Sequence, residues 1–365
     1  MLFFASVTGW APSPRLEPPL YKQCDALWAN VTMGTSGPGE QNTICHEGCA
    51  MSCVAMALAG SGFTLPDGGA PNPGSLNSWL QAHDGYTCDK GDCNNLVLDA
   101  PNRLTGGRMR FVGEWNASDV SLASVAANLA SKEMTYVAHV RIPPPPHPVR
   151  HFVLLTGFDN SSSSFTVLDP GYDVSTYAVA DVHDYLLYET LPTSAVVPSP
   201  GYPLFKQCDP RWGADTIVTT TICAVGCLLT STAMMLRERH ISIGGDDATP
   251  ARLNTFLQTH GGYDAHNDMS EAVVAMVDPA RVAWTNESMH TKPDVSWTTI
   301  VQMLERGAPV IANVMHGHHF VLVVGYDKSG DTLFVNDPGF SRSTYSFADD
   351  VVGWRFYNIT GGVSE

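Results

Sequence analysis

The strongest constraint on this chain is an internal duplication of nearly its whole length. Six sequence blocks occur twice in one order, beginning with PLYKQCDALW from Pro19 and PLFKQCDPRW from Pro203. Units of 20–50 residues would indicate a solenoid, but each copy here has about 160 to 170 residues and can hold a core of its own. The sequence therefore predicts two similar domains.

The duplication also sets the expected boundaries. We expect a first domain over residues 20–190 and a second over 202–360, joined by a stiff linker at 191–201 that contains three prolines. Residues 1–19 precede the first copy and begin with the apolar run MLFFASVTGWA. They are interpreted either as a clipped or atypical signal peptide or as an apolar N-terminal arm.

Composition excludes several classes of protein. Hydrophobic residues make up 44% and charged residues 15%, a combination that is not typical of disordered chains. Because 36 acidic residues outnumber 20 Lys and Arg, we expect no nucleic-acid partner. Apolar runs are all interrupted before the length that a bilayer crossing needs, so we also expect no membrane span.

The order of elements is the same in both copies. Apolar spacing predicts helices in the first part of each copy, and β-branched runs bounded by Gly, Pro and Asp predict strands in the second part. This order is typical of α+β folds. The helices are expected from Cys49 and Cys227, over Leu76–Ala82 and Leu253–Thr259, and over Asp119–Ser131 and Asp294–Arg306, with Asp119 and Asp294 as N-caps.

Each copy also carries a Cys at a helix start, a His that opens a strand and an Asp before Pro-Gly. A helix N-terminus favours a thiolate, a nearby His takes and returns its proton, and an Asp orients the ring. The His-to-Asp spacing is 18 in both copies, whereas the Cys-to-His spacing is 102 and 92. The predicted nucleophiles, bases and orienting residues are Cys49, His151 and Asp169 in the first copy and Cys227, His319 and Asp337 in the second.

A glutamine lies upstream of each cysteine, Gln23 and Gln207, both in the sequence KQCD. The first copy also contains EGCAMSCVAM, HFVLLTGF and LDPGY, and the second contains VGCLLTSTAM, HFVLVVGY and NDPGF. With these blocks, each copy resembles the bacteriocin-processing (double-glycine leader) peptidase-like family of papain-like cysteine peptidases. The resemblance implies two papain-like domains, each with a helical part that carries Cys and an antiparallel sheet that carries His and Asp. It also implies that Gln23 and Gln207 donate to the oxyanion.

The remaining cysteines are assigned by comparing the copies. Cys24 and Cys45 recur as Cys208 and Cys223, which predicts an equivalent disulfide in each copy. Cys88 and Cys93 lie in a loop of the first copy alone and are expected to form a local bridge. Cys53 then remains as a buried helix thiol. A zinc site of Cys45, Cys49 and Cys53 is disfavoured because Ser231 replaces the third cysteine in the second copy.

The expected function is a cysteine hydrolase, a peptidase or amidase, with a complete site in each repeat and no metal or organic cofactor. Two alternatives stay open: a cysteine acyltransferase or peptide ligase with the same triad, and a peptide-binding module without catalysis. Disulfides and five glycosylation sequons predict a secreted or a lysosomal or vacuolar location, within the secretory pathway. The sequons are at Asn30, Asn116, Asn160, Asn286 and Asn358.

Overall fold

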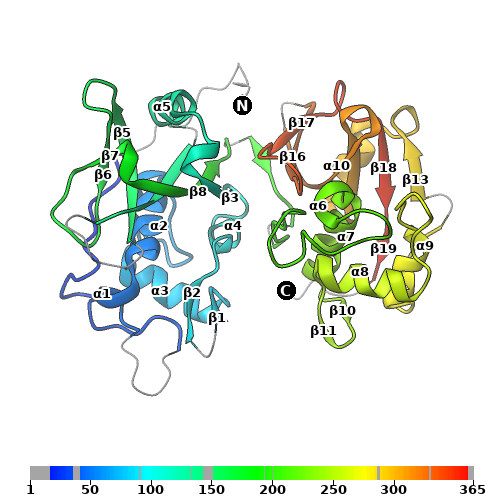
Figure 1. Cartoon of the computed structure of the whole chain (residues 1–365), viewed down its shortest axis with the longest axis horizontal. Helices are drawn as coiled ribbons and strands as arrows, with labels where there is room; N and C mark the ends of the chain where they lie inside the picture. Colours follow the sequence, from blue (N-terminus) through cyan, green and yellow to red (C-terminus); the bar gives the residue numbers. More distant parts are fainter. Residues whose placement is uncertain are drawn as a thin grey trace. The chain divides into compact units, whose positions relative to one another are not determined.

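The computed structural model describes residues 17–35, 42–89, 92–132, 134–142, 151–192, 194–199, 201–285, 288–328 and 330–360. The chain divides into two compact units, Met1–Thr193 and Ser194–Glu365 (Figure 1). Most of the predicted N-terminal arm and the sequon at Asn286 lie outside the described residues.

The first unit is mixed α+β, with its main sheet formed late in the chain. The sheet has the order β3-β8-β4-β5-β6-β7, and all its neighbouring strands are antiparallel. Its helices are α1 (Ile44–Glu47), α2 (Cys49–Gly60), α3 (Pro73–Ala82), α4 (Ala100–Leu104) and α5 (Leu122–Ser131). Its strands are β1 (Tyr86–Asp89), β2 (Asp92–Leu96), β3 (Met109–Asn116), β4 (Met134–Val140), β5 (His151–Asp159), β6 (Ser164–Leu168), β7 (Thr176–Ala178) and β8 (Val182–Thr190).

Helices cover both faces of this sheet because successive strand residues point to opposite sides. Val137 of β4 packs in a core with α2, whereas its neighbours Tyr136 and Ala138 pack in another core with Val125 of α5. Nearly every side chain of α2 from Met51 to Leu58 is fully buried. The helix that begins at Cys49 is therefore held rigidly against the sheet.

The second unit repeats this plan with the sheet order β13-β18-β14-β15-β16-β17. Its helices are α6 (Ile222–Val225), α7 (Cys227–Glu238), α8 (Pro250–Thr259), α9 (Glu271–Val274) and α10 (Trp297–Glu305). Its strands are β9 (Ala195–Val196), β10 (Ser242–Ile243), β11 (Asp246–Asp247), β12 (Val282–Ala283), β13 (Met289–Thr291), β14 (Val310–Val314), β15 (His319–Asp327), β16 (Thr332–Asn336), β17 (Thr344–Ser346), β18 (Gly353–Phe356) and β19 (Asn358–Ile359).

Two local features go beyond or differ from what the sequence predicted. The segment predicted as a linker also contains the short strand β9, which pairs with the end of β15 at Tyr326 and Asp327. The N-caps of α5 and α10 are Ser121 and Ser296, two residues after the predicted aspartates, because each serine hydroxyl accepts a hydrogen bond from the N–H three residues later. The aspartates lie in short 3-10 turns instead.

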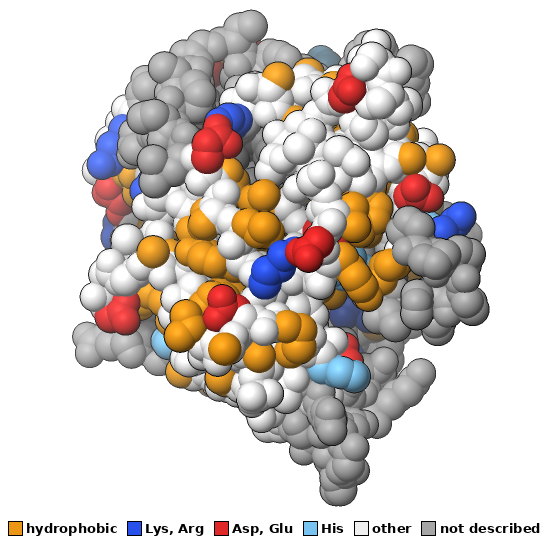
Figure 2. All heavy atoms as spheres, turned by 90° about the vertical axis from the view of Figure 1, so that its left-hand side faces the viewer, with side chains coloured by type: hydrophobic (Ala, Val, Ile, Leu, Met, Phe, Trp, Pro, Cys, Tyr) orange, Lys and Arg blue, Asp and Glu red, His pale blue; other side chains and the backbone are white. Residues whose placement is uncertain are grey.

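The surface reflects the low share of charged residues. Figure 2 shows one face, on which charged side chains are few and are scattered among neutral and hydrophobic ones. Four predicted sequon asparagines, Asn30, Asn116, Asn160 and Asn358, are exposed. Within the described ranges, every helix is too short or too polar to span a bilayer.

Candidate active site

Both candidate nucleophiles are the first residue of a long helix. Cys49 begins α2 and Cys227 begins α7, and both side chains are half-buried. The preceding residue must be glycine, because a Cβ on Gly48 would lie 2.4 Å from the carbonyl oxygen of Ile44. The Gly-Cys pair thus lets two helices follow each other with the sulfur at the second N-terminus, where helix amides favour a negative charge.

Each candidate base is hydrogen bonded to its predicted orienting residue. His151 opens β5, and its Nε2 lies 2.8 Å from Oδ1 of Asp169, which follows β6. The equivalent atoms of His319 and Asp337 are 2.7 Å apart. All four side chains are buried, and the exposed fraction of both aspartates is 1%. Because Nε2 faces the carboxylate, Nδ1 is the ring nitrogen left to face the cysteine.

The charge state of the histidines follows from these neighbours. Burial lowers the pKa of His151, but hydrogen bonds with Asp169 and Cys49 and their negative charges outweigh it and raise the pKa to about 9. Asp337 and Cys227 act in the same way against the burial of His319 and raise its pKa to about 9. Both rings are therefore imidazolium at neutral pH. Such a ring stabilises a thiolate beside it and carries the proton that a leaving group needs.

The aspartates are anchored by donors that the sequence analysis did not identify. Asp169 accepts hydrogen bonds from the backbone N–H of Gly171 and Tyr172 and from the hydroxyl of Tyr177, at 2.8 to 2.9 Å. Burial raises the pKa of Asp169, but His151, the backbone N–H of Tyr172 and the hydroxyl of Tyr177 outweigh it and hold the pKa below its ordinary value. Tyr345 donates to Asp337 in the same way at 2.7 Å. The signal for these tyrosines was the recurrence of Ser-Thr-Tyr after each Asp, with the tyrosine eight residues later in both copies.

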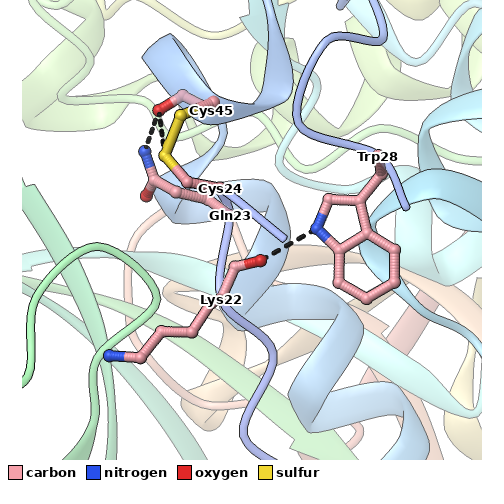
Figure 3. The surroundings of a disulfide bond; sticks show 5 residues. All are labelled: Lys22, Gln23, Cys24, Trp28 and Cys45. Carbon is pink, nitrogen blue, oxygen red and sulfur yellow. Dashed lines mark hydrogen bonds between the residues drawn. A yellow bond between two sulfur atoms is a disulfide. The ribbon is translucent and has the colours of Figure 1, made fainter. Parts of the chain in front are cut away.

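The predicted oxyanion donors lie on a loop that docks against the Asp-Pro-Gly turn. The backbone N–H of Gln23 donates to the carbonyl of Pro170, and its side-chain Nε2 donates to the carbonyl of Cys45 at 2.6 Å (Figure 3). Gln207 makes the equivalent bonds to Pro338 and Cys223. A side-chain amide has two hydrogens, so one hydrogen of each Nε2 remains for another acceptor.

A lysine that the sequence analysis passed over holds the same two segments together. Lys22 Nζ donates to the carbonyls of Asp169 and Tyr172, at 3.1 and 2.5 Å. Lys206 donates to the carbonyls of Asp337 and Phe340, both at 2.7 Å. Three successive residues of the KQCD block thus have different roles. The Lys binds the loop that carries the aspartate, the Gln provides the side-chain amide and the Cys forms a disulfide.

The structure contains the three predicted disulfides, Cys24–Cys45, Cys88–Cys93 and Cys208–Cys223. The first disulfide connects the Gln23 loop to Cys45 (Figure 3). Cys45 lies in α1, which directly precedes the helix of Cys49. Since Cys45 is bonded to Cys24, it is not available as a zinc ligand. Across the described part of the chain, no group of three His, Cys, Asp or Glu side chains is arranged to hold a metal ion.

Both repeats match the same known protein family. Residues 18–189 match the model of the Peptidase_C39 like family, and residues 201–364 match it again. The chain belongs to this family, within the clan of papain-like cysteine peptidases, as the resemblance of the sequence blocks predicted. No match was found among the curated proteins.

Proposed function

We propose that each unit is a cysteine peptidase domain, with Cys49 and Cys227 as nucleophiles, His151 and His319 as general bases, and Asp169 and Asp337 as orienting residues. The observation that carries the proposal is a buried histidine at a strand start, bonded to an aspartate after the next strand, present twice in one chain. Family membership supports peptide bonds as the substrate class.

The reaction follows from these groups. The thiolate attacks the carbonyl carbon of a peptide bond, and its negative charge moves to the carbonyl oxygen. The helix N-terminal amide and the free hydrogen of Gln23 or Gln207 stabilise that oxyanion. The imidazolium gives its proton to the leaving amine, which leaves a thioester on sulfur. The neutral imidazole then takes a proton from water, which hydrolyses the thioester.

The test is covalent labelling by an electrophilic peptide mimic together with hydrolysis of a peptide mixture, both followed by mass spectrometry. Labelling is expected at Cys49 and Cys227, and His151→Ala or His319→Ala should abolish it in the same unit. His83→Ala is the matched control, because His83 is exposed and its ring bonds the carbonyl of Trp79, outside the candidate site. Equal, slow labelling of wild type and variants would favour a peptide-binding module instead.

Adding a peptide amine to the same assay separates hydrolysis from acyl transfer. A hydrolase gives the free acid as its main product at any practical amine concentration. Joined peptides as the main product would assign the chain to the peptide ligases and contradict the hydrolase proposal.

We also place the chain in the secretory pathway, since disulfides persist in oxidising compartments and four sequon asparagines are exposed. Expression in a eukaryotic secretory host is expected to yield protein whose mass falls after treatment with an N-glycosidase. An unchanged mass would remove the glycosylation argument.

A further inference from the structure

One buried residue in each unit links the cysteine helix to the histidine strand. Cys53 lies one helical turn after Cys49, and its Sγ donates to the carbonyl oxygen of Phe152 at 3.4 Å. Ser231 lies one turn after Cys227, and its Oγ donates to the carbonyl oxygen of Phe320 at 3.3 Å. Both phenylalanines directly follow the histidines, and neither donor has any exposed surface.

The position of this contact matters because it lies at the end of a strand. The pairing of β5 with β6 begins at Leu154, and that of β15 with β16 begins at Leu322. His151 and His319 precede these pairs. They are paired on the other side, with Val140 of β4 and Val314 of β14. The helix side chain is thus an additional tie on the strand end that carries the imidazole.

The chemistry of the two donors explains why a thiol and a hydroxyl can replace each other here. Both are small, and both offer one hydrogen to a backbone carbonyl. Burial, with the charges of Cys49 and Asp169, raises the pKa of Cys53 well above its ordinary value. Cys53 therefore keeps its proton while Cys49 reacts, so it stays a donor and does not compete as a nucleophile.

We infer that Cys53 and Ser231 are positioning residues, which hold the strand end so that each imidazole stays beside its cysteine sulfur. This role rests on the proposed function, because it acts through His151 and His319. It also accounts for the odd number of cysteines: Cys53, the one cysteine that is neither in a disulfide nor a candidate nucleophile, is the first unit's counterpart of Ser231.

The experiment measures the pH dependence of alkylation of one cysteine by iodoacetamide, with the other site silenced. In a Cys227→Ala background, Cys53→Ala is expected to lower the alkylation rate of Cys49 at mildly acidic pH by about tenfold, because a loosened imidazolium stabilises the thiolate less. The profile should move toward that of a free thiol, and Cys53→Ser should restore it. In a Cys49→Ala background, Ser231→Ala is expected to lower the alkylation rate of Cys227 in the same way, whereas Ser231→Cys should keep the wild-type profile.

The matched controls are Ser52→Ala and Thr230→Val. Each removes a buried hydroxyl that has no hydrogen-bond partner in the described structure and is adjacent to the positioning residue. They should leave the alkylation profiles unchanged. An alanine variant that lowers the melting temperature but keeps the wild-type profile would overturn the inference, as would a Ser231→Cys protein that behaves like Ser231→Ala.

Failure of the proposed function is seen separately. If both cysteines of the wild-type protein alkylate like free thiols, the peptidase proposal fails before any variant is compared. If Cys53→Ala does not fold, Ser231→Ala still decides, because that change removes a single hydroxyl.

Discussion

The residue with the most contacts in each site is the aspartate rather than the cysteine. One oxygen of Asp169 faces His151 and two backbone N–H groups, and the other accepts the hydroxyl of Tyr177. A carboxylate with this many donors stays ionised and keeps its orientation. The direction of the imidazole is therefore set by the turn that follows β6 as much as by the strand that carries the ring.

The tyrosine contact predicts a defined loss. Tyr177→Phe removes the donor to a buried carboxylate oxygen and is expected to lower the free energy of unfolding of the first unit by about 1–2 kcal/mol. Hydrolysis at Cys49 should also slow. Chemical denaturation measures the first effect and peptide hydrolysis the second. Tyr86→Phe is the control, because it removes a bond to Asn77 outside the site, and it should leave hydrolysis unchanged.

The histidine charge predicts the pH range of activity. Because the pKa of His151 is raised to about 9, the imidazolium should persist at neutral pH and be lost as pH rises through that value. Hydrolysis in a Cys227→Ala protein is expected to fall on this alkaline side. Asp169→Asn should lower the pKa of His151 toward its ordinary value of 6.5 and move the decline to lower pH.

Asp184→Asn is the control for that series. Asp184 pairs with another histidine, His139, at 2.8 Å, so this change should leave the alkaline decline in place. A decline that does not move in Asp169→Asn would show that the imidazole at this site does not control the pH dependence.

Close packing beside the imidazole makes a glycine necessary. A Cβ on Gly171 would lie 2.9 Å from Cε1 of His151, and a Cβ on Gly339 would lie equally close to His319. Gly171→Ala is expected to displace the ring and lower kcat at the first site by about a hundredfold. Gly157→Ala is the control. Gly157 lies in β5, the strand that begins with His151, and a Cβ on it would be 3.6 Å from the nearest atom, in Thr166. Equal kcat values for the two variants would refute the packing argument.

At the scale of elements, the site is formed where a loop, a helix start and two strand ends meet. The loop that carries Gln23 has little regular structure of its own. It is held by the Lys22 bonds, by the backbone bond to Pro170 and by the Cys24–Cys45 disulfide. These hydrogen bonds and the disulfide hold Gln23 in place, although the loop around it is neither helix nor strand.

The disulfide can be tested by removing it. The Cys24→Ser, Cys45→Ser protein is expected to lose about 3 kcal/mol of unfolding free energy, since the bridge closes a loop with a sequence separation of 21. Hydrolysis at the first site should also fall, because Gln23 lies on that loop. Removing the Cys88–Cys93 disulfide, which has a sequence separation of 5, should change hydrolysis little.

The number of free thiols tests all three disulfides together. Intact-mass measurement after thiol alkylation should count three free thiols in the protein.

At the scale of the whole molecule, the duplication is visible in the sheets as well as in the sequence. The order of six strands along each main sheet and the histidine–aspartate bond of each candidate site are the same in both units, and β9 is an addition to the second sheet. Each unit contains its own cysteine, histidine, aspartate and glutamine, so neither candidate site needs a residue from the other.

We therefore predict that the activity of each site is independent of the cysteine in the other unit. Cys227→Ala should abolish labelling and hydrolysis at the second site and leave those at Cys49 unchanged, and Cys49→Ala should do the converse. Site-resolved labelling by mass spectrometry measures both. Complete loss of activity from either single change would show that the two sites depend on each other.

The sequence alone determined the duplication, the α+β class, the family and the residues proposed for catalysis. These features can be recognised from recurrence, periodicity and short motifs in the sequence. Comparing the two copies was also enough to predict the disulfide between Cys24 and Cys45. The sequence did not predict the strands β3 and β13, which lie before α5 and α10 and belong to the main sheets. The choice of a serine over an aspartate as N-cap was missed because both residue types suit that position.

Only the tertiary structure decided which groups meet over long distances in the chain. The bond from Cys53 to Phe152 joins residues 99 positions apart, and that from Lys22 to Asp169 joins residues 147 apart. Such contacts depend on strand register and on how a helix packs against a sheet, which no local pattern specifies. The tyrosines, the lysines and the positioning residues therefore became recognisable only in the folded chain.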